Sequence, residues 1–330
     1  VGFLNYSLDN YFTYLTSINE VHNINMVLGM NYQKTEQELI SVQGEGFPSD
    51  QFTRLNDAAD IIAGSSFGTE FSLLSYFFRA NYDYNKKILL SLNGRVDGSS
   101  RFGENNRYGF FPAVSAGYVL SEESFLKDSN TPISFLKIRG SYGLTGNAEI
   151  GNFDWRGLAG GSTYGGQPGL QLSTVANPDL KWETTAQMDI GLDFGLFKNR
   201  LTGEIDYYKK NTTDLLLNVT IPSTVGFTSV LQNIGELENR GIEVVLNSEN
   251  FVGEFKWSTS FNISFNRNEI KNLGKVATGE DRVITSGINR AMVGQPIGVF
   301  WMPEYAGVDP ENGDALWYIN DPELAADSVT

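Results

Sequence analysis

Apolar and polar residues alternate strictly in long segments, which is the pattern of β-strands with two unlike faces. Between Trp257 and Asn266 the odd positions are mostly apolar and the even positions are Ser or Asn. The same period of two recurs in further segments, most of them nine to eleven residues long, at 24–32, 74–82, 88–96, 110–118, 136–144 and 186–196, and in two shorter ones at 201–207 and 242–246. No Asp, Glu, Lys or Arg lies on the apolar side of these segments.

The opposite side of the same segments is too charged to be the packed core of a soluble protein. It carries Arg79, Asp83, Arg95, Asp97, Lys137, Arg139, Asp189, Asp193, Glu204, Asp206 and Glu243. Strands of soluble sandwiches average about 5–6 residues, whereas strands that cross a bilayer need about 9–11. The sequence therefore predicts an all-β, antiparallel up-and-down transmembrane β-barrel with its apolar side toward lipid.

The connections between these segments are alternately short and long, as in outer-membrane barrels with short periplasmic turns and long extracellular loops. Short connections fall near 19–21, 83–86, 198–199 and 250–253, with a medium one at 121–132. Long connections fall at 35–69, 98–106, 145–181, 211–234 and after 268, where Val293 to Tyr305 is one further candidate strand. We expect a partial barrel of about ten to twelve strands, because a small closed barrel would fill its interior with side chains.

Composition excludes several functional classes. The 330 residues have a formal net charge of −15, which disfavours nucleic acid as a partner. Zero Cys and one His remove thiolate zinc sites and conventional His-based triads, so we expect no enzyme, no cofactor and no metal centre. The chain opens Val1-Gly2-Phe3 without a leader, so we expect it to be a piece of a longer exported protein.

Several ordered motifs resemble those of one family. They are Arg95-Val96-Asp97-Gly98-Ser99-Ser100-Arg101-Phe102-Gly103, Gly109-Phe110-Phe111-Pro112, Leu136-Lys137-Ile138-Arg139-Gly140-Ser141-Tyr142-Gly143, Asn177-Pro178-Asp179-Leu180-Lys181-Trp182-Glu183 and Asn239-Arg240-Gly241-Ile242-Glu243. From about Asn10 to Asp314 the chain is similar to the SusC/RagA-type TonB-dependent outer-membrane transporters.

The resemblance implies a plugged barrel of about 22 strands in the cell outer membrane. It implies TonB-energised import of oligosaccharides (glycans) or, alternatively, peptides, together with a SusD-like surface lipoprotein. Residues 1–330 would then be part of the β-barrel domain, and the N-terminal domain, the TonB-contacting segment, the plug and the closing strands would lie outside this sequence.

Two groups of residues are candidates for the transport path. The charges predicted to face the lumen, and so the plug or the substrate, are Arg95, Asp97, Arg101, Arg139, Asp189 and Asp193, with scaffold ion pairs as the alternative role. Asp97 and Gly98 are expected to leave their strand through a turn. Phe153, Trp155 and Tyr164 lie in a long Gly-rich segment and are candidate ligand or lid contacts. Trp182 and Phe111 are expected in an aromatic girdle at the outer membrane boundary.

Three other interpretations are weaker. A barrel hydrolase would need His22 with a Ser, or the pair Asp189 and Asp193 as catalytic carboxylates. A strand would separate these two carboxylates by about 13 Å, which is farther than the paired carboxylates of glycosidases stand apart. A calcium site at Asp309, Asn312 and Asp314 lacks the spacing of the twelve-residue loop, so a turn is expected there. A soluble β adhesin would need polar outer faces, which the charge-free apolar sides oppose.

Overall fold

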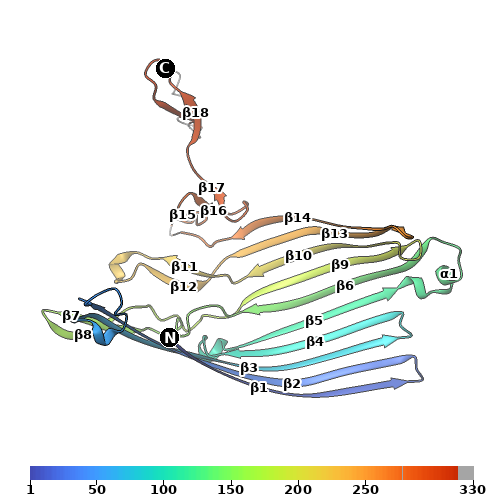
Figure 1. Cartoon of the computed structure of the whole chain (residues 1–330), viewed down its shortest axis with the longest axis horizontal. Coiled ribbons are helices and arrows are strands. Elements are labelled where there is room, and N and C mark those ends of the chain that lie inside the picture. The colour runs from blue at the N-terminus through green and yellow to red at the C-terminus, as the bar shows by residue number, and fades with distance from the viewer. Residues whose placement is uncertain (277, 319–330) are drawn as a thin grey trace.

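A computed structural model describes residues 1–276 and 278–318 of the chain. Ten strands form a single antiparallel sheet in which neighbours in space follow one another along the chain (Figure 1). They are β1 (Gly2–Ile18), β2 (His22–Glu45), β3 (Asp60–Tyr84), β4 (Ile88–Ser99), β5 (Tyr108–Val119), β6 (Ile133–Asn147), β9 (Glu183–Leu196), β10 (Leu201–Thr213), β13 (Glu236–Val252) and β14 (Lys256–Asn272). The predicted up-and-down architecture is confirmed.

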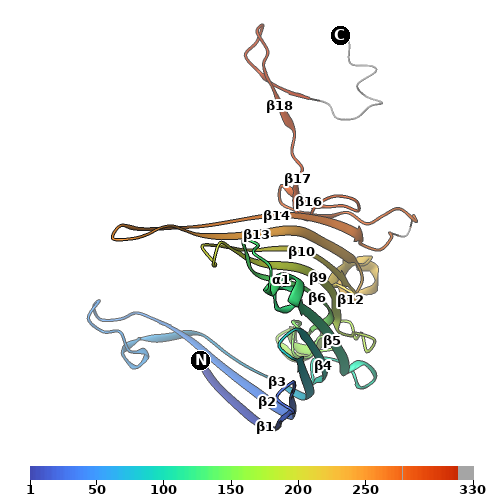
Figure 2. The ribbon, with the colours of Figure 1, turned by 90° about the vertical axis from the view of Figure 1, so that its right-hand side faces the viewer.

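The sheet is a curved, open arc with β1 and β14 at its two edges (Figure 2). The further strand predicted at Val293 to Tyr305 is wrong. Within it only Val299–Phe300 (β17) and the first residues of β18 are extended, and β17 pairs with β16 (Asn289–Ala291) in a small separate sheet. Gly294 and Gly298 have positive φ in this segment, which interrupts a long strand.

The apolar residues that alternate along the strands are exposed rather than packed into a core. Leu92, Val114, Ile190 and Phe265 are all exposed on one face, which we call the apolar face. The buried apolar residues of the described chain are few and cluster near strand ends and loops: Phe102, Phe111, Val119, Leu180, Val219, Ile270 and Leu273. A face this apolar has no partner within the described chain, which agrees with its predicted contact with lipid.

Tight turns lie at one end of the sheet. Asn19 and Glu20 both have positive φ, as do Asn85 and Lys86, which is the geometry of two-residue hairpin turns. The medium connection holds η3 (Leu120–Glu122) and α1 (Ser124–Lys127) at the same end (Figure 1). Among the described residues no helix is long and apolar enough to cross a bilayer.

The long connections lie at the opposite end of the sheet, and they contain more regular structure than the sequence pattern predicted. The loop expected at 35–69 is largely a hairpin, because β2 and β3 remain paired out to Glu45 and Asp60, and it reaches away from the sheet as the blue arm of Figure 2. The remaining connections carry η1 (Leu55–Asp57), η2 (Glu104–Asn106), β7 (Ala159–Tyr164), β8 (Gln167–Leu172), β11 (Leu216–Thr220), η4 (Ser223–Val225), β12 (Ser229–Asn233), β15 (Ile284–Ser286), β18 (Glu304–Val308) and β19 (Ala315–Tyr318). Backbone pairing needs no apolar face, so hydrophobic periodicity does not detect these pairs.

Candidate functional site

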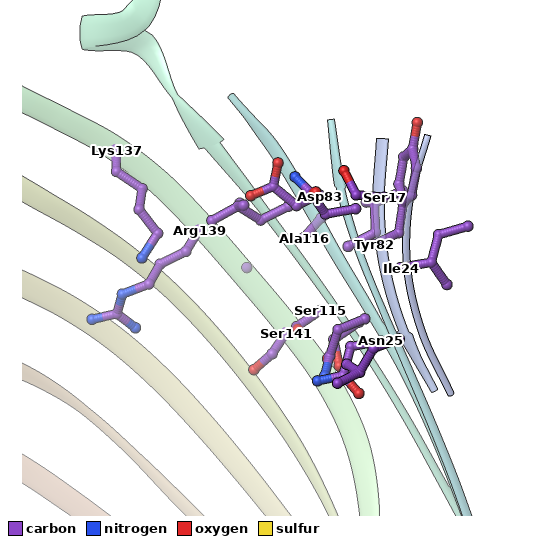
Figure 3. Close-up of a pocket in the computed structure, with 18 of the residues that line it drawn as sticks. Ser17, Ile24, Asn25, Tyr82, Asp83, Ser115, Ala116, Lys137, Arg139 and Ser141 are labelled. Carbon is purple, nitrogen blue, oxygen red and sulfur yellow. The ribbon is translucent and has the colours of Figure 1, made fainter. Parts of the chain in front are cut away.

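The face opposite the apolar face, which we call the polar face, carries a row of small polar residues aligned by the strand register. Consecutive members of this row are cross-strand partners. The row, which we call the hydroxyl-amide row, consists of Asn25, Asn81, Ser91, Ser115 and Ser141, and it ends at Asp189. It lines a hollow of about 670 Å³ bounded by β1 to β6 and β9 (Figure 3).

Beside this row, Arg139 on β6 is the centre of an ion-pair cluster. Its guanidinium lies 3.1 Å from Asp189, 2.9 Å from Asp193 and 2.6 Å from Asp206. Lys137, which extends beside Arg139 in Figure 3, lies 3.0 Å from Asp193. We call these five residues the Arg139 cluster. They come from β6, β9 and β10, so the cluster connects three strands through charge-assisted hydrogen bonds.

One of two glycines beside Arg139, Gly191, gives the arginine side chain the room to lie flat on the sheet. Gly117 and Gly191 are its cross-strand partners on β5 and β9. A Cβ on Gly191 would lie 2.5 Å from the Arg139 Cζ atom, so the Arg139 and Asp206 side chains would have to move away from their present contact. Because Gly191 has no side chain, the guanidinium reaches across it to Asp206 on the next strand.

Arg95 and Asp97 on β4 form a second, separate pair. Arg95 Nε donates to Asp97 Oδ1 at 2.6 Å, and Arg95 Nη2 donates to Ser75 Oγ at 2.8 Å. The predicted turn at Asp97 and Gly98 is wrong, because β4 continues to Ser99 and Gly98 does not have positive φ. Gly98 instead accommodates the Tyr108 ring, which occupies the space of a Cβ.

Arg101 is held by a connection at the loop end rather than lying on the strands. Its Nε atom donates to Asn152 Oδ1 at 2.9 Å and its Nη1 atom donates to the Ala148 carbonyl at 3.0 Å. The guanidinium also stacks on Phe71, 4.2 Å from the ring centroid. Arg101 therefore fastens the connection after β6 onto β3.

The three loop aromatics are in unlike surroundings. Tyr164, at the tip of the β7–β8 hairpin, is 91% exposed. Phe153 and Trp155 are half-buried, and Arg156 lies over the Trp155 ring at 4.7 Å. The structure does not bring the three together as one stacking surface, and Tyr164 alone among them projects freely.

Trp182 belongs to a small core on the loop side of the sheet. Its ring centroid is 5.3 Å from both Phe102 and Phe111, and its Nε1 atom donates to the Arg107 carbonyl at 3.0 Å. The predicted girdle position of Trp182 and Phe111 is wrong, because Phe111 lies on the polar side of β5, opposite in parity to Phe110. This core, with Leu180, is where the motif Asn177–Glu183 has its structural role.

The residues of the weaker interpretations have structural partners. His22 Nδ1 lies 2.7 Å from the Tyr82 hydroxyl at the short-turn end. Asp189 and Asp193 bind the same guanidinium. Asp309 and Asn312 accept hydrogen bonds from backbone N–H groups two residues further on, as expected of a turn.

The hydroxyl-amide row was missed by sequence reasoning. Parity places all of its members on the polar face, but only the register makes them neighbours across six strands. Asp206 was noted as a polar-face charge, although nothing in the sequence pairs it with Arg139, 67 positions away.

Comparisons with known proteins agree with this architecture. Residues 2–318 match the family model described as TonB dependent receptor-like, beta-barrel. The chain is 38% identical over 312 residues to TonB-dependent receptor P26 of Formosa agariphila, covering 91% of this chain and 31% of that protein. It is 38% identical over 252 residues to TonB-dependent receptor SusC of Bacteroides thetaiotaomicron, covering 72% of this chain and 24% of that protein.

Among solved structures, the RagAB peptide transporter superposes with a TM-score of 0.87 at 34% identity, covering 96% of this chain and 35% of that one. The chain thus spans about a quarter to a third of the length of these relatives. The predicted resemblance and outer-membrane location are confirmed: the chain belongs to the TonB-dependent receptors of the SusC/RagA type, and it carries part of their outer-membrane β-barrel.

Proposed function

We propose that this chain is part of the wall of a TonB-energised importer of nutrient oligosaccharides that works with a SusD-like surface lipoprotein. The hydroxyl-amide row is the observation that carries the substrate class. Oligosaccharides are neutral and rich in hydroxyl groups, and Asn and Ser side chains both donate and accept hydrogen bonds. A ligand path lined by such groups recognises a sugar chain without the desolvation cost of unpaired charges.

Tyr164 is the loop residue best placed to meet substrate outside the barrel. Its exposed ring offers an apolar face with a polar hydroxyl tip, a combination that suits contact with sugar rings. Asp189, Asp193 and Arg139 have a mainly structural role in this proposal, because each is already paired within the Arg139 cluster.

Peptide import is the second candidate, and a specific observation favours it. The solved relative with a TM-score of 0.87 is named as a peptide transporter. Because the chain is about a third of such a transporter, the remaining wall and the plug contribute contacts that decide between the two substrate classes.

The test uses the complete parent transporter purified with its lipoprotein. Binding of labelled oligosaccharides and of labelled peptides of similar mass is measured side by side, with the double variant Ser115→Ala, Ser141→Ala and the matched apolar-face variant Val114→Ala. We expect oligosaccharide binding that the double variant weakens several-fold and Val114→Ala leaves unchanged. Binding of peptides alone would establish the second candidate, and cleavage of either ligand would contradict a pure transporter.

A further inference from the structure

Three cations lie in register on the apolar face, one step beyond its last apolar row. Lys209 on β10 is the cross-strand partner of Arg240 on β13, and Arg240 is the partner of Arg267 on β14. The row before them on the same face consists of Tyr207, Ile242 and Phe265, which are likewise partners. We call Lys209, Arg240 and Arg267 the basic row.

The position of the basic row along the strands places it at a membrane boundary. On β14 the apolar-face residues run from Trp257 to Phe265, about 26 Å along the strand at roughly 3.3 Å per residue. A strand tilt of about 40° reduces this to a height of about 20 Å, close to the apolar band of outer-membrane barrels. Arg267 follows Phe265 toward the end of the sheet that carries the long connections, which is the extracellular side.

Charge at this site is only partly compensated. Glu238, which is buried, lies 2.8 Å from Lys209, 3.7 Å from Arg240 and 3.9 Å from Lys271, and Glu269 pairs with Lys271 at 2.7 Å. Within the described part of the chain Arg267 has no carboxylate within 4.0 Å. With Glu236, which precedes Glu238 by two residues on the same face of β13, four cations stand against three carboxylates, an excess of one positive charge in a chain whose net charge is −15.

The directly opposed Arg240 and Arg267 are unfavourable without a further anion, because Glu238 reaches Arg240 and Lys209 but forms no ion pair with Arg267. Like charges on directly opposed residues of neighbouring strands repel one another and lower stability. Arg240 and Arg267 are both exposed or half-exposed, so an external ligand can reach them. A phosphate group bridging two guanidinium groups would replace this repulsion with bidentate, charge-assisted hydrogen bonds.

We propose that the basic row binds the phosphate groups of an anionic lipid in the outer leaflet of the membrane. The row is continuous with the exposed apolar residues Ile242 and Phe265, so a lipid bound there places its acyl chains against them and its headgroup at the cations. A soluble anion would use the cations but not the apolar surface below them. The site lies on the outside of the barrel, opposite the polar face, so it is separate from the transport path and independent of which substrate is carried.

The experiment measures lipid binding to the detergent-purified parent transporter by native mass spectrometry. The probes are bisphosphorylated lipid A and the same lipid with its phosphates removed, with inorganic phosphate as a competitor. The test variant is Arg240→Gln, Arg267→Gln. The matched control is Lys34→Gln, because Lys34 shares the face and parity of Tyr32 but is neutralised by Glu36 at 2.7 Å and Glu70 at 3.0 Å.

We expect the phosphorylated lipid to bind at least about tenfold more tightly than the dephosphorylated one, and the double variant to abolish that preference. The Lys34→Gln variant should keep it. Equal binding by wild type and double variant, or an equal loss in Lys34→Gln, would overturn the proposal. Full displacement of the lipid by inorganic phosphate would also overturn the proposal. If the double variant kept its lipid binding but lost the lipoprotein partner, the basic row would be a protein contact instead.

Discussion

Placing a charge at the middle of the apolar face tests the assignment of the two faces most directly. Phe261 on β14 is 49% exposed and lies midway between Trp257 and Phe265, about 10 Å in height from either edge of the apolar band. Arg or Lys at the midplane of a barrel's lipid face costs about 2–4 kcal/mol. We therefore expect Phe261→Arg to lower the free energy of unfolding by about 3 kcal/mol, or roughly a hundredfold in the folding equilibrium.

The matched control is the adjacent residue. Asn262 is exposed on the polar face of the same strand, so Asn262→Arg changes the same backbone region but puts the charge into water. Phe261→Leu measures the loss of the ring without a charge. The parent protein would be folded into phosphatidylcholine vesicles and unfolded with guanidinium while Trp fluorescence is followed. The reasoning is refuted if Asn262→Arg costs as much as Phe261→Arg, or if Phe261→Arg costs no more than Phe261→Leu.

Three further predictions concern the polar face and the loop end, each checked by the same unfolding measurement. Arg139→Leu leaves the three aspartates of the Arg139 cluster without their guanidinium, so we expect the free energy of unfolding to fall by about 1–2 kcal/mol at neutral pH. This loss should shrink in acid, because protonation of the aspartates removes the repulsion between their carboxylates. Gly191→Ala should cost about 1 kcal/mol because its Cβ would push the ends of Arg139 and Asp206 apart and break their ion pair, whereas Gly117→Ala, whose nearest neighbour would be 3.4 Å away, should be nearly neutral. Trp182→Ala should cost about 3 kcal/mol and expose residues 148–181 to proteolysis, because its ring packs on Phe102 and Phe111.

Much of the fold was predictable because the period-two alternation is a local property. The face of Ile190 or Asp189 follows from parity along one strand, and parity agrees with the observed exposure. The short turns were predictable for a similar reason, since residues such as Asn19 and Asn85 tolerate positive φ. The long connections were less predictable, because hairpins such as β7–β8 are held by backbone pairing among glycines and polar residues.

The candidate site was predictable only in part, because it depends on contacts between strands that parity does not fix. The sequence selected Arg139, Asp189 and Asp193, and the structure brings these three together. It also selected Phe153 and Trp155 as ligand contacts, but both are half-buried. Trp182 was assigned to the outer aromatic girdle because aromatic residues at strand ends favour the membrane interface, whereas here its ring packs against Phe102 and Phe111 on the polar side.

The two charged sites of this sheet differ in how they obtain their partners, and register explains the difference. Lys209 and Lys210 are neighbours in the chain but lie on opposite faces, so parity sends one to the membrane boundary and the other to the polar side. Register then decides the partners: Lys209 meets Arg240, whereas Arg139 meets Gly191 and, across it, Asp206. A shift of one residue at the turn of Phe197 to Asn199 would move Asp206 to the apolar face and Lys209 to the polar one. The turn between β9 and β10 therefore decides both that Asp206 reaches Arg139 and that Lys209 lies on the apolar face beside Arg240, where Glu238 compensates only part of the positive charge of the basic row.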